Sequence, residues 1–95
     1  MSAVVWKYEV EANGRDNAIT MPKGARILHV EHQDARPSVV TFWAEVDPAA
    51  EWESRTFVVV GTGHPVPDGA RYVGTDCVLP TLVWHLYETT SAVTS

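Results

Sequence analysis

The sequence contains little cysteine and no long apolar run, and each shortage excludes a class of protein. Its single cysteine, Cys77, excludes an intrachain disulfide and a cysteine-rich zinc site. The longest unbroken aliphatic or aromatic run, FVVV at 57–60, is too short to span a membrane. The first residues, MSAVVWKYEVE, lack the basic and apolar regions of a signal peptide. We therefore expect a protein of a reducing cytoplasm with no membrane partner.

Basic residues are also scarce. Seven lysines and arginines stand against twelve aspartates and glutamates, so the formal net charge is −5 at pH 7. Binding of DNA or RNA rests on lysines and arginines that neutralise phosphates, and here these residues form no run along the chain. We expect no nucleic-acid partner. The seven basic residues are Lys7, Arg15, Lys23, Arg26, Arg36, Arg55 and Arg71.

The residues that are abundant indicate a globular protein. Hydrophobic residues make up 45% of the chain, which is enough to offset by burial the entropy of ordering one core. The length predicts a single domain, residues 1–95. The small, polar residues at the end, about 90–95, predict a flexible tail.

Alternation of apolar and polar residues predicts β-strands. The clearest strand is VVWKYEVE at 4–11. In ARILHVEHQ, strict alternation places Ile27, His29 and Glu31 together on one face of a strand. In SVVTFWAEV and the aspartate after it, alternation predicts an apolar face of Val40, Phe42, Ala44 and Val46 and a second face of Thr41, Trp43, Glu45 and Asp47.

Glycine, proline and asparagine separate these strands at roughly ten-residue spacing. DPAAEWES, in which Asp47 precedes Pro48, is the one helix-start signal and is short enough for a single turn. RTFVVVGT and RYVGTDCVLPTLVWHLYETT supply the remaining strands. The chain is therefore predicted to be all-β and mainly antiparallel. We expect a small sandwich or barrel of about six strands with at most one short helical turn.

The stretch GTGHPVPDG at 61–69 allows two interpretations. In the first, consecutive backbone N–H groups at the glycines bind a small anion, a histidine adds a donor, and an arginine supplies counter-charge. The stretch lacks the lysine of a P-loop and the third glycine of a dinucleotide fingerprint. In the second, it is a pair of turns between strands. The first interpretation assigns Gly61, Thr62, Gly63, His64, Arg26 and Arg71 as ligand-binding residues.

Patterns for catalysis and metal binding are weak. His29 and His32 lie three apart, which on a strand places them on opposite faces, so we expect no metal site and no cofactor. Cys77 is expected to be a small buried hydrophobe. There is no Gly-x-Ser-x-Gly elbow and no His-Glu-x-x-His, so we assign no catalytic residue and expect no enzyme. The alternative is a small hydrolase that uses His64 with Asp68 or Asp76.

The four tryptophans divide into core and surface candidates. Trp6 and Trp84, in the first and last strands, are expected to pack in the core. Trp43 shares its face with polar residues, so we expect it to be half-buried and assign it to an interface, where tryptophan is enriched. The alternative is that Trp43 packs against the segment around Trp52.

Three blocks follow one another along the chain: MPKGA-IL-V at 21–30, GTGHP at 61–65 and VWH-(Y/F)E at 83–88. With them, nearly the whole chain resembles a family of proteins of this length found in tailed bacteriophages and bacterial prophages. That family has no assigned activity, so the resemblance implies a β-rich domain in an infected or lysogenic bacterium and transfers no site residue. YVGTDCVLPTLVWH departs from the shorter YIGT hairpin of the family, which leaves this connection open.

The residues and the resemblance together favour a non-enzymatic binding module of the host cytoplasm. Its partner would be a host or phage protein or a small anionic ligand. The alternatives are a minor structural or decorating protein of the virion and the small hydrolase described above. Unpaired strand edges and a half-buried tryptophan also favour a homo-oligomer.

Overall fold

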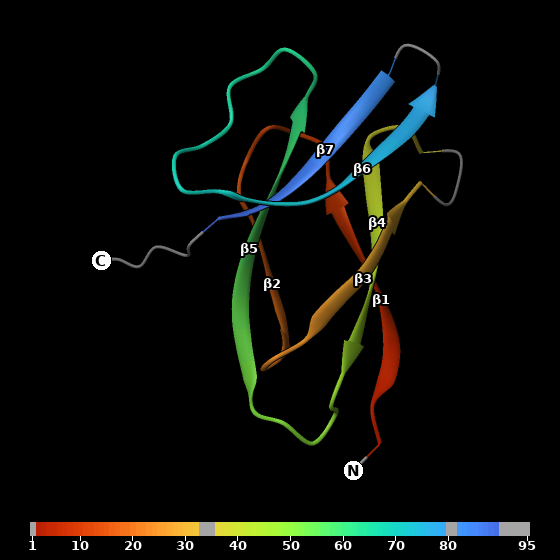
Figure 1. The fold of residues 1–95 in the computed structure, drawn as a ribbon, viewed down its shortest axis with the longest axis vertical. Coiled ribbons are helices and arrows are strands. Elements are labelled where there is room, and N and C mark those ends of the chain that lie inside the picture. The colour runs from red at the N-terminus through yellow and green to blue at the C-terminus, as the bar shows by residue number, and fades with distance from the viewer. Residues whose placement is uncertain (1, 33–35, 80–81, 90–95) are drawn as a thin grey trace.

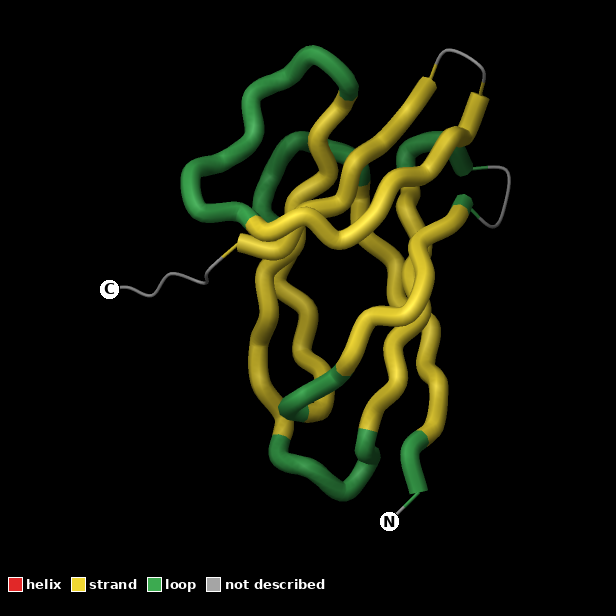
Figure 2. The backbone as a smooth tube through the Cα atoms, viewed as in Figure 1, coloured by secondary structure: helices red, strands yellow, loops and turns green. Residues whose placement is uncertain are grey.

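The computed structural model describes residues 2–32, 36–79 and 82–89, and within them no helix occurs (Figures 1 and 2). The predicted tail at 90–95 lies outside the described residues. The all-β prediction is confirmed, with one strand more than expected because NAITMP also forms a strand. The strands are β1 (Val4–Glu11), β2 (Asn17–Pro22), β3 (Arg26–Glu31), β4 (Val39–Val46), β5 (Trp52–Gly61), β6 (Arg71–Leu79) and β7 (Leu82–Thr89).

The strands form two sheets that pack face to face as a sandwich. One sheet has three strands in the order β1-β4-β3, and the other has four in the order β2-β5-β7-β6. All of these neighbouring strands pair antiparallel. Since β7 lies between β5 and β6, the connection at 62–70 has to pass β7 to reach β6.

The core lies between the sheets and is built from alternate residues. The predicted apolar face of β4 is confirmed, since Val40, Phe42, Ala44 and Val46 are all buried. The ring of Phe42 lies 5.0 Å from that of Phe57 in β5, measured between centroids, and joins the two sheets. Trp6 and Trp84 pack against this core as predicted. β-branched and aromatic residues at every second position therefore supply both the strand preference and the buried apolar area.

The expected helix start at Asp47 is a single turn. The backbone N–H of Ala49 donates to Asp47 Oδ1 at 3.0 Å, and that of Ala50 donates to the Asp47 carbonyl, also at 3.0 Å. β5 begins soon afterwards at Trp52. The aspartate thus caps one turn that joins the two sheets.

The face predicted for Ile27 is wrong. Strict alternation put Ile27 and His29 on the same face, but Ile27 pairs with Ala44 and His29 pairs with Trp43. The register shift is a β-bulge at Leu28, and one extra residue turns His29 to the opposite face from Ile27. A bulge of this kind leaves no mark in the apolar pattern of the strand.

The burial predicted for Cys77 is also wrong. Cys77 is exposed and pairs with Val83 on the outer face of its sheet. The inward position beside it is taken by Asp76, which is 5% exposed. β6 has register shifts between Tyr72 and Gly74 and again after Cys77. These irregularities decide which residues of an edge strand face the core, and the sequence does not show them.

β3 and β6 belong to different sheets but pack against each other along one side of the sandwich (Figure 1). They meet at Gly74. A Cβ atom at that position would lie 2.5 Å from Val30 Cγ2 and 2.9 Å from Val30 Cβ. The close approach of the two strands therefore requires glycine.

Candidate functional site

The stretch 61–69 forms two consecutive turns. In the first, the backbone N–H of His64 donates to the Gly61 carbonyl at 3.0 Å. Gly63 adopts a left-handed φ of 92°, which glycine accepts without strain. A second hydrogen-bonded turn spans 67–70. Both turns of the second interpretation are thus present, and the His64 N–H is already used inside the first of them.

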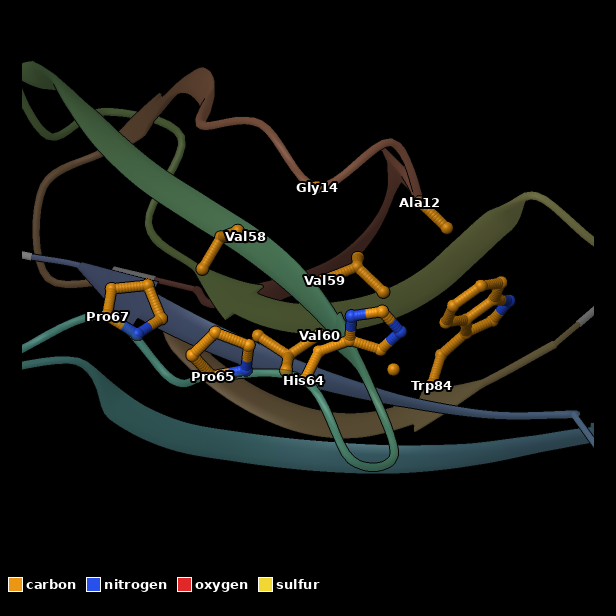
Figure 3. A pocket seen from close by; sticks show the side chains of 10 residues that line it. Ala12, Gly14, Val58, Val59, Val60, His64, Pro65, Pro67 and Trp84 are labelled. Atoms are coloured by element: carbon orange, nitrogen blue, oxygen red, sulfur yellow. The ribbon is translucent and has the colours of Figure 1, made fainter.

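Side chains of these turns cover an apolar pocket of about 390 Å³ against β5 (Figure 3). His64 and Trp84 lie at one end of this apolar pocket, and Pro65 and Pro67 lie at the other. A Cβ atom at Gly61 would lie 3.1 Å from His64 Cδ2 and 3.3 Å from Trp84 Cζ3. Glycine at the end of β5 therefore lets both rings close over the strand.

A second pocket, of about 460 Å³, opens between the first residues of β3 and those of β6. It receives an arginine from each of three strands: Arg26 of β3, Arg55 of β5 and Arg71 of β6. Among the described residues that line it, Glu88 of β7 is the one carboxylate. We call this pocket the arginine groove. Its lining is cationic, although the chain as a whole is acidic.

Arg55 and Glu88 form the fixed floor of the arginine groove. Arg55 Nε donates to Glu88 Oε2 at 2.6 Å, and Nη2 donates to Oε1 at 2.8 Å. Arg55 Nη1 also donates to the Ala25 carbonyl at 2.6 Å. The two side chains are only 14% and 12% exposed. This bidentate pair ties β5 to β7 and to the chain that enters β3.

Arg71 and Arg26 are the exposed arginines of the groove. Arg71 Nη2 donates to Glu88 Oε1 at 2.8 Å, and Arg26 Nη2 donates to Glu45 Oε1 at 3.0 Å. Their side chains are 73% and 72% exposed. A guanidinium carries five N–H donors, so each keeps donors for another acceptor. Because the single carboxylate of Glu88 is shared by Arg55 and Arg71, these three side chains together keep a net positive charge.

The same contacts set the ionisation of the floor. Hydrogen bonds from Arg55 lower the pKa of Glu88, burial opposes this by raising it, and Arg71 lowers it further. The hydrogen bond to Glu88 also raises the pKa of Arg55, against the effect of burial. Both groups are therefore held in their charged forms.

Acid is expected to weaken the fold through Glu88. Because its pKa is lower in the folded protein than in the unfolded chain, its stabilising effect is complete above the unfolded value of about 4.3 and is lost as the pH falls through the folded pKa. Urea unfolding of the wild type and of Glu88→Gln should show free energies of unfolding that differ at about pH 7, with a difference that shrinks progressively as the pH falls below about 4.5. A difference that stays constant across this range would contradict the assignment.

The structure divides the predicted ligand-binding residues between two places. Gly61 and His64 line the apolar pocket, and Arg26 and Arg71 line the arginine groove. The hydroxyl oxygen of Thr62 lies 2.9 Å from His85 Nε2 on the exposed surface. Gly63 is in the first turn with the left-handed φ already described. The two arginines that were assigned as counter-charges thus line one groove, and none of residues 61–64 is among the residues that line it.

Sequence reasoning missed Arg55. In RTFVVV it resembles the polar start of an apolar strand. One signal was available, because Arg55 precedes Phe57 by two residues and must share its inward face. An inward charge needs a partner. That partner, Glu88, is 33 residues away in the sequence and could not be identified before the strand order was known.

Trp43 is half-buried, as predicted. It lies on the outer face of the three-stranded sheet, between Lys7 of β1 and His29 of β3. Its ring centroid is 6.1 Å from that of His29. The alternative contact with the segment around Trp52 is not seen among the described residues, where Trp52 instead contacts Trp6 at 5.9 Å. The interface role of Trp43 stays a prediction.

The fold and the groove define a class of protein: a small antiparallel β-sandwich that gathers three arginines at one opening between its sheets. In the described part of the chain, no three His, Cys, Asp or Glu side chains are grouped as metal ligands, and no helix is long and apolar enough to cross a membrane. The chain belongs to a family described as a domain of unknown function (DUF7352), which matches residues 1–95. No curated protein and no solved structure is significantly similar to it.

Proposed function

We propose that the protein is a binding module whose arginine groove holds a small anionic ligand. The observation that carries this proposal is the convergence of Arg26, Arg55 and Arg71 on one groove of a chain with a net charge of −5. The whole chain contains only seven lysines and arginines. Gathering three of them at one opening creates a local positive potential that attracts anions.

The arginine groove combines a rigid part with an exposed part. Glu88 and the Ala25 carbonyl hold Arg55 in place, so its charge is pre-organised. Arg26 and Arg71 reach into solvent with unused donors. A carboxylate or phosphate group can accept paired hydrogen bonds from such a guanidinium. The volume of about 460 Å³ suits a small molecule.

The biological setting of this proposal rests on the resemblance of the sequence blocks. We place the module in the cytoplasm of a bacterium that carries the phage or prophage, where the ligand is a small anionic metabolite or signal. A protein of the virion and a small hydrolase are the alternatives to this module. In the described structure His64 lines an apolar pocket and Asp76 is an inward residue of β6. Among the described residues no hydrogen bond or ion pair joins the His64 ring to Asp68 or Asp76, so no contact there supports hydrolysis.

Replacing Arg71 with alanine is expected to weaken anion binding at least about tenfold, because a hydrogen bond to a charged group contributes about 1.5 to 3 kcal/mol. Inorganic pyrophosphate is a suitable probe, and binding is measured by titration calorimetry at low salt. Backbone amide shifts recorded during the titration should move at 24–27 and 71–73, the two segments that border the arginine groove.

Two variants control this experiment. Arg15→Ala removes the same charge from the β1–β2 connection, next to the apolar pocket, and should leave pyrophosphate binding unchanged. His64→Ala tests the glycine stretch and should also leave it unchanged. If Arg15→Ala lost as much affinity as Arg71→Ala, the binding would be non-specific. If His64→Ala abolished it and shifts appeared at 61–64, the ligand would lie at the turn and the groove proposal would be wrong.

A further inference from the structure

The outer face of the four-stranded sheet carries no aspartate, glutamate, lysine or arginine among its described residues. The strand register defines this uncharged face. It contains alternate residues of β2 from Ala18, of β5 from Ser54 and of β7 from Val83, together with Tyr72, Thr75 and Cys77 of β6. Pro22, Val58 and Val60 on this side are already buried, the two valines in the apolar pocket beside Pro65 and Pro67, and they are not part of the exposed area. The charged residues of these strands, such as Arg55, face the other way.

The outer face of the three-stranded sheet has the opposite character. Its alternate residues include many charges: Arg26 of β3 pairs with Glu45 of β4 at 3.0 Å, and within β3 the Nε2 atom of His29 lies 2.8 Å from Glu31 Oε1. The charged residues on that face are Lys7, Glu9, Glu11, Arg26, Glu31 and Glu45. The sandwich therefore exposes one charged sheet and one uncharged sheet. An acidic protein with this distribution repels its own copies except where the uncharged face meets a partner.

Polar groups on the uncharged face already bond to one another. The Tyr72 hydroxyl lies 2.6 Å from Thr75 Oγ1, and Thr75 Oγ1 lies 3.1 Å from His85 Nδ1. His85 Nε2 in turn lies 2.9 Å from Thr62 Oγ1. Removing these four side chains from water costs little free energy, because they already have hydrogen-bond partners.

The same face presents an anchored aromatic side chain. Tyr72 is 56% exposed, and its ring meets Tyr87 edge-on at 5.7 Å with an interplanar angle of 70°. The bond to Thr75 fixes its hydroxyl. Tyrosine is enriched and charged residues are depleted at the cores of protein interfaces. Tyr72, which is fixed, largely exposed and surrounded by uncharged residues, therefore matches the composition of an interface core.

We propose that this uncharged face is the contact between two copies of the chain in a two-fold dimer. In such a contact the same patch meets itself, so a patch with no charge brings no like charges together. A charged partner would find its complement on the three-stranded sheet instead. Tyr72 also borders the arginine groove, so the contact reaches the edge of that groove, while Arg71 points to Glu88 on the inner side of β6. The dimer is measured without any added anion, so a failure of this proposal is distinguishable from a failure of anion binding.

Sedimentation analysis over a concentration series tests the dimer directly. The wild type should show a reversible monomer–dimer equilibrium, and Tyr72→Glu should raise the dissociation constant at least about tenfold, because two like charges would face each other across the axis. The matched control is Val5→Glu, which introduces the same charge at an equally exposed position on the outer face of the other sheet and should leave the equilibrium unchanged. Amide shifts on dilution should be confined to β6, β7 and their neighbours on the uncharged face.

Three outcomes would overturn the proposal. The first is a wild type that stays monomeric up to about 1 mM, where even weak association is detected. The second is a dimer that Val5→Glu weakens as much as Tyr72→Glu does. The third outcome concerns a second variant, which is needed if circular dichroism shows that Tyr72→Glu fails to fold. Cys77→Glu, at an exposed position of the same face, then decides the question, and an unchanged dissociation constant for that variant rejects the contact.

Discussion

Replacing Gly74 with alanine is expected to lower the free energy of unfolding by about 2 to 3 kcal/mol. The new Cβ atom would lie 2.5 Å from Val30 Cγ2 and 2.9 Å from Val30 Cβ, so β3 and β6 would have to move apart. A change of rotamer cannot relieve the clash, because the Cβ of Val30 is itself too close. Urea denaturation of the two proteins measures the difference.

The double variant Val30→Ala, Gly74→Ala separates this clash from a general effect of glycine replacement. Val30→Ala removes the nearest methyl group, so the two changes together should cost at least about 1 kcal/mol less than the sum of the single costs. Gly61→Ala is the control within β5, where the nearest atom belongs to the exposed ring of His64 at 3.1 Å and can shift. Its cost should stay below about 1 kcal/mol. Additive costs for the pair at 30 and 74 would show that the two strands do not touch there.

Replacing Arg55 with methionine is expected to destabilise the protein by about 2 to 3 kcal/mol. Loss of one member of a fully buried ion pair costs about 3 to 5 kcal/mol, and here the two side chains keep a small exposure of 14% and 12%. The Glu88 carboxylate would lose its bidentate partner, and the Ala25 carbonyl would lose a donor. The change is measured by urea unfolding at about pH 7, where Glu88 is ionised.

Two comparisons show whether this cost comes from the stranded carboxylate. Arg26→Met breaks an exposed pair and should cost less than about 1 kcal/mol. The double variant Arg55→Met, Glu88→Leu removes both charges and should recover much of the lost stability, since apolar residues of similar size can replace a buried pair. If the double variant were less stable than Arg55→Met alone, the two side chains would not be coupled as described.

Local pattern was sufficient for the fold class but not for the faces of every strand. The apolar alternation of β4 predicted its buried side chains, and turn residues predicted where β5 ends. The strand at 17–22 was missed, because NAITMP is short and ends in proline. Bulges overturned the face predicted for Ile27 and the burial predicted for Cys77. Each bulge depends on the twist and pairing of neighbouring strands, so it cannot be predicted from the sequence of one strand alone.

The candidate site shows the same limit more strongly. Arg26 and Arg71 were selected as counter-charges for an anion at 61–64, and they instead share a groove with Arg55. Their sequence positions are far apart, so the grouping arises from strand order alone. The glycine stretch proved to be two turns over an apolar pocket. The composition shows that basic residues are few, but it could not predict that three of them line the same groove.

The sequence by itself determined an all-β antiparallel domain with one core. Period-two alternation, β-branched residues and turn residues act over a few positions, and they are legible in any one segment. Only the tertiary structure decided that three arginines meet at the arginine groove, that Gly74 must lack a side chain, and that one outer face carries no charge. These features depend on which strands become neighbours and in which register. Strand order and register are set when the whole chain packs, so they cannot be predicted from any local stretch of sequence.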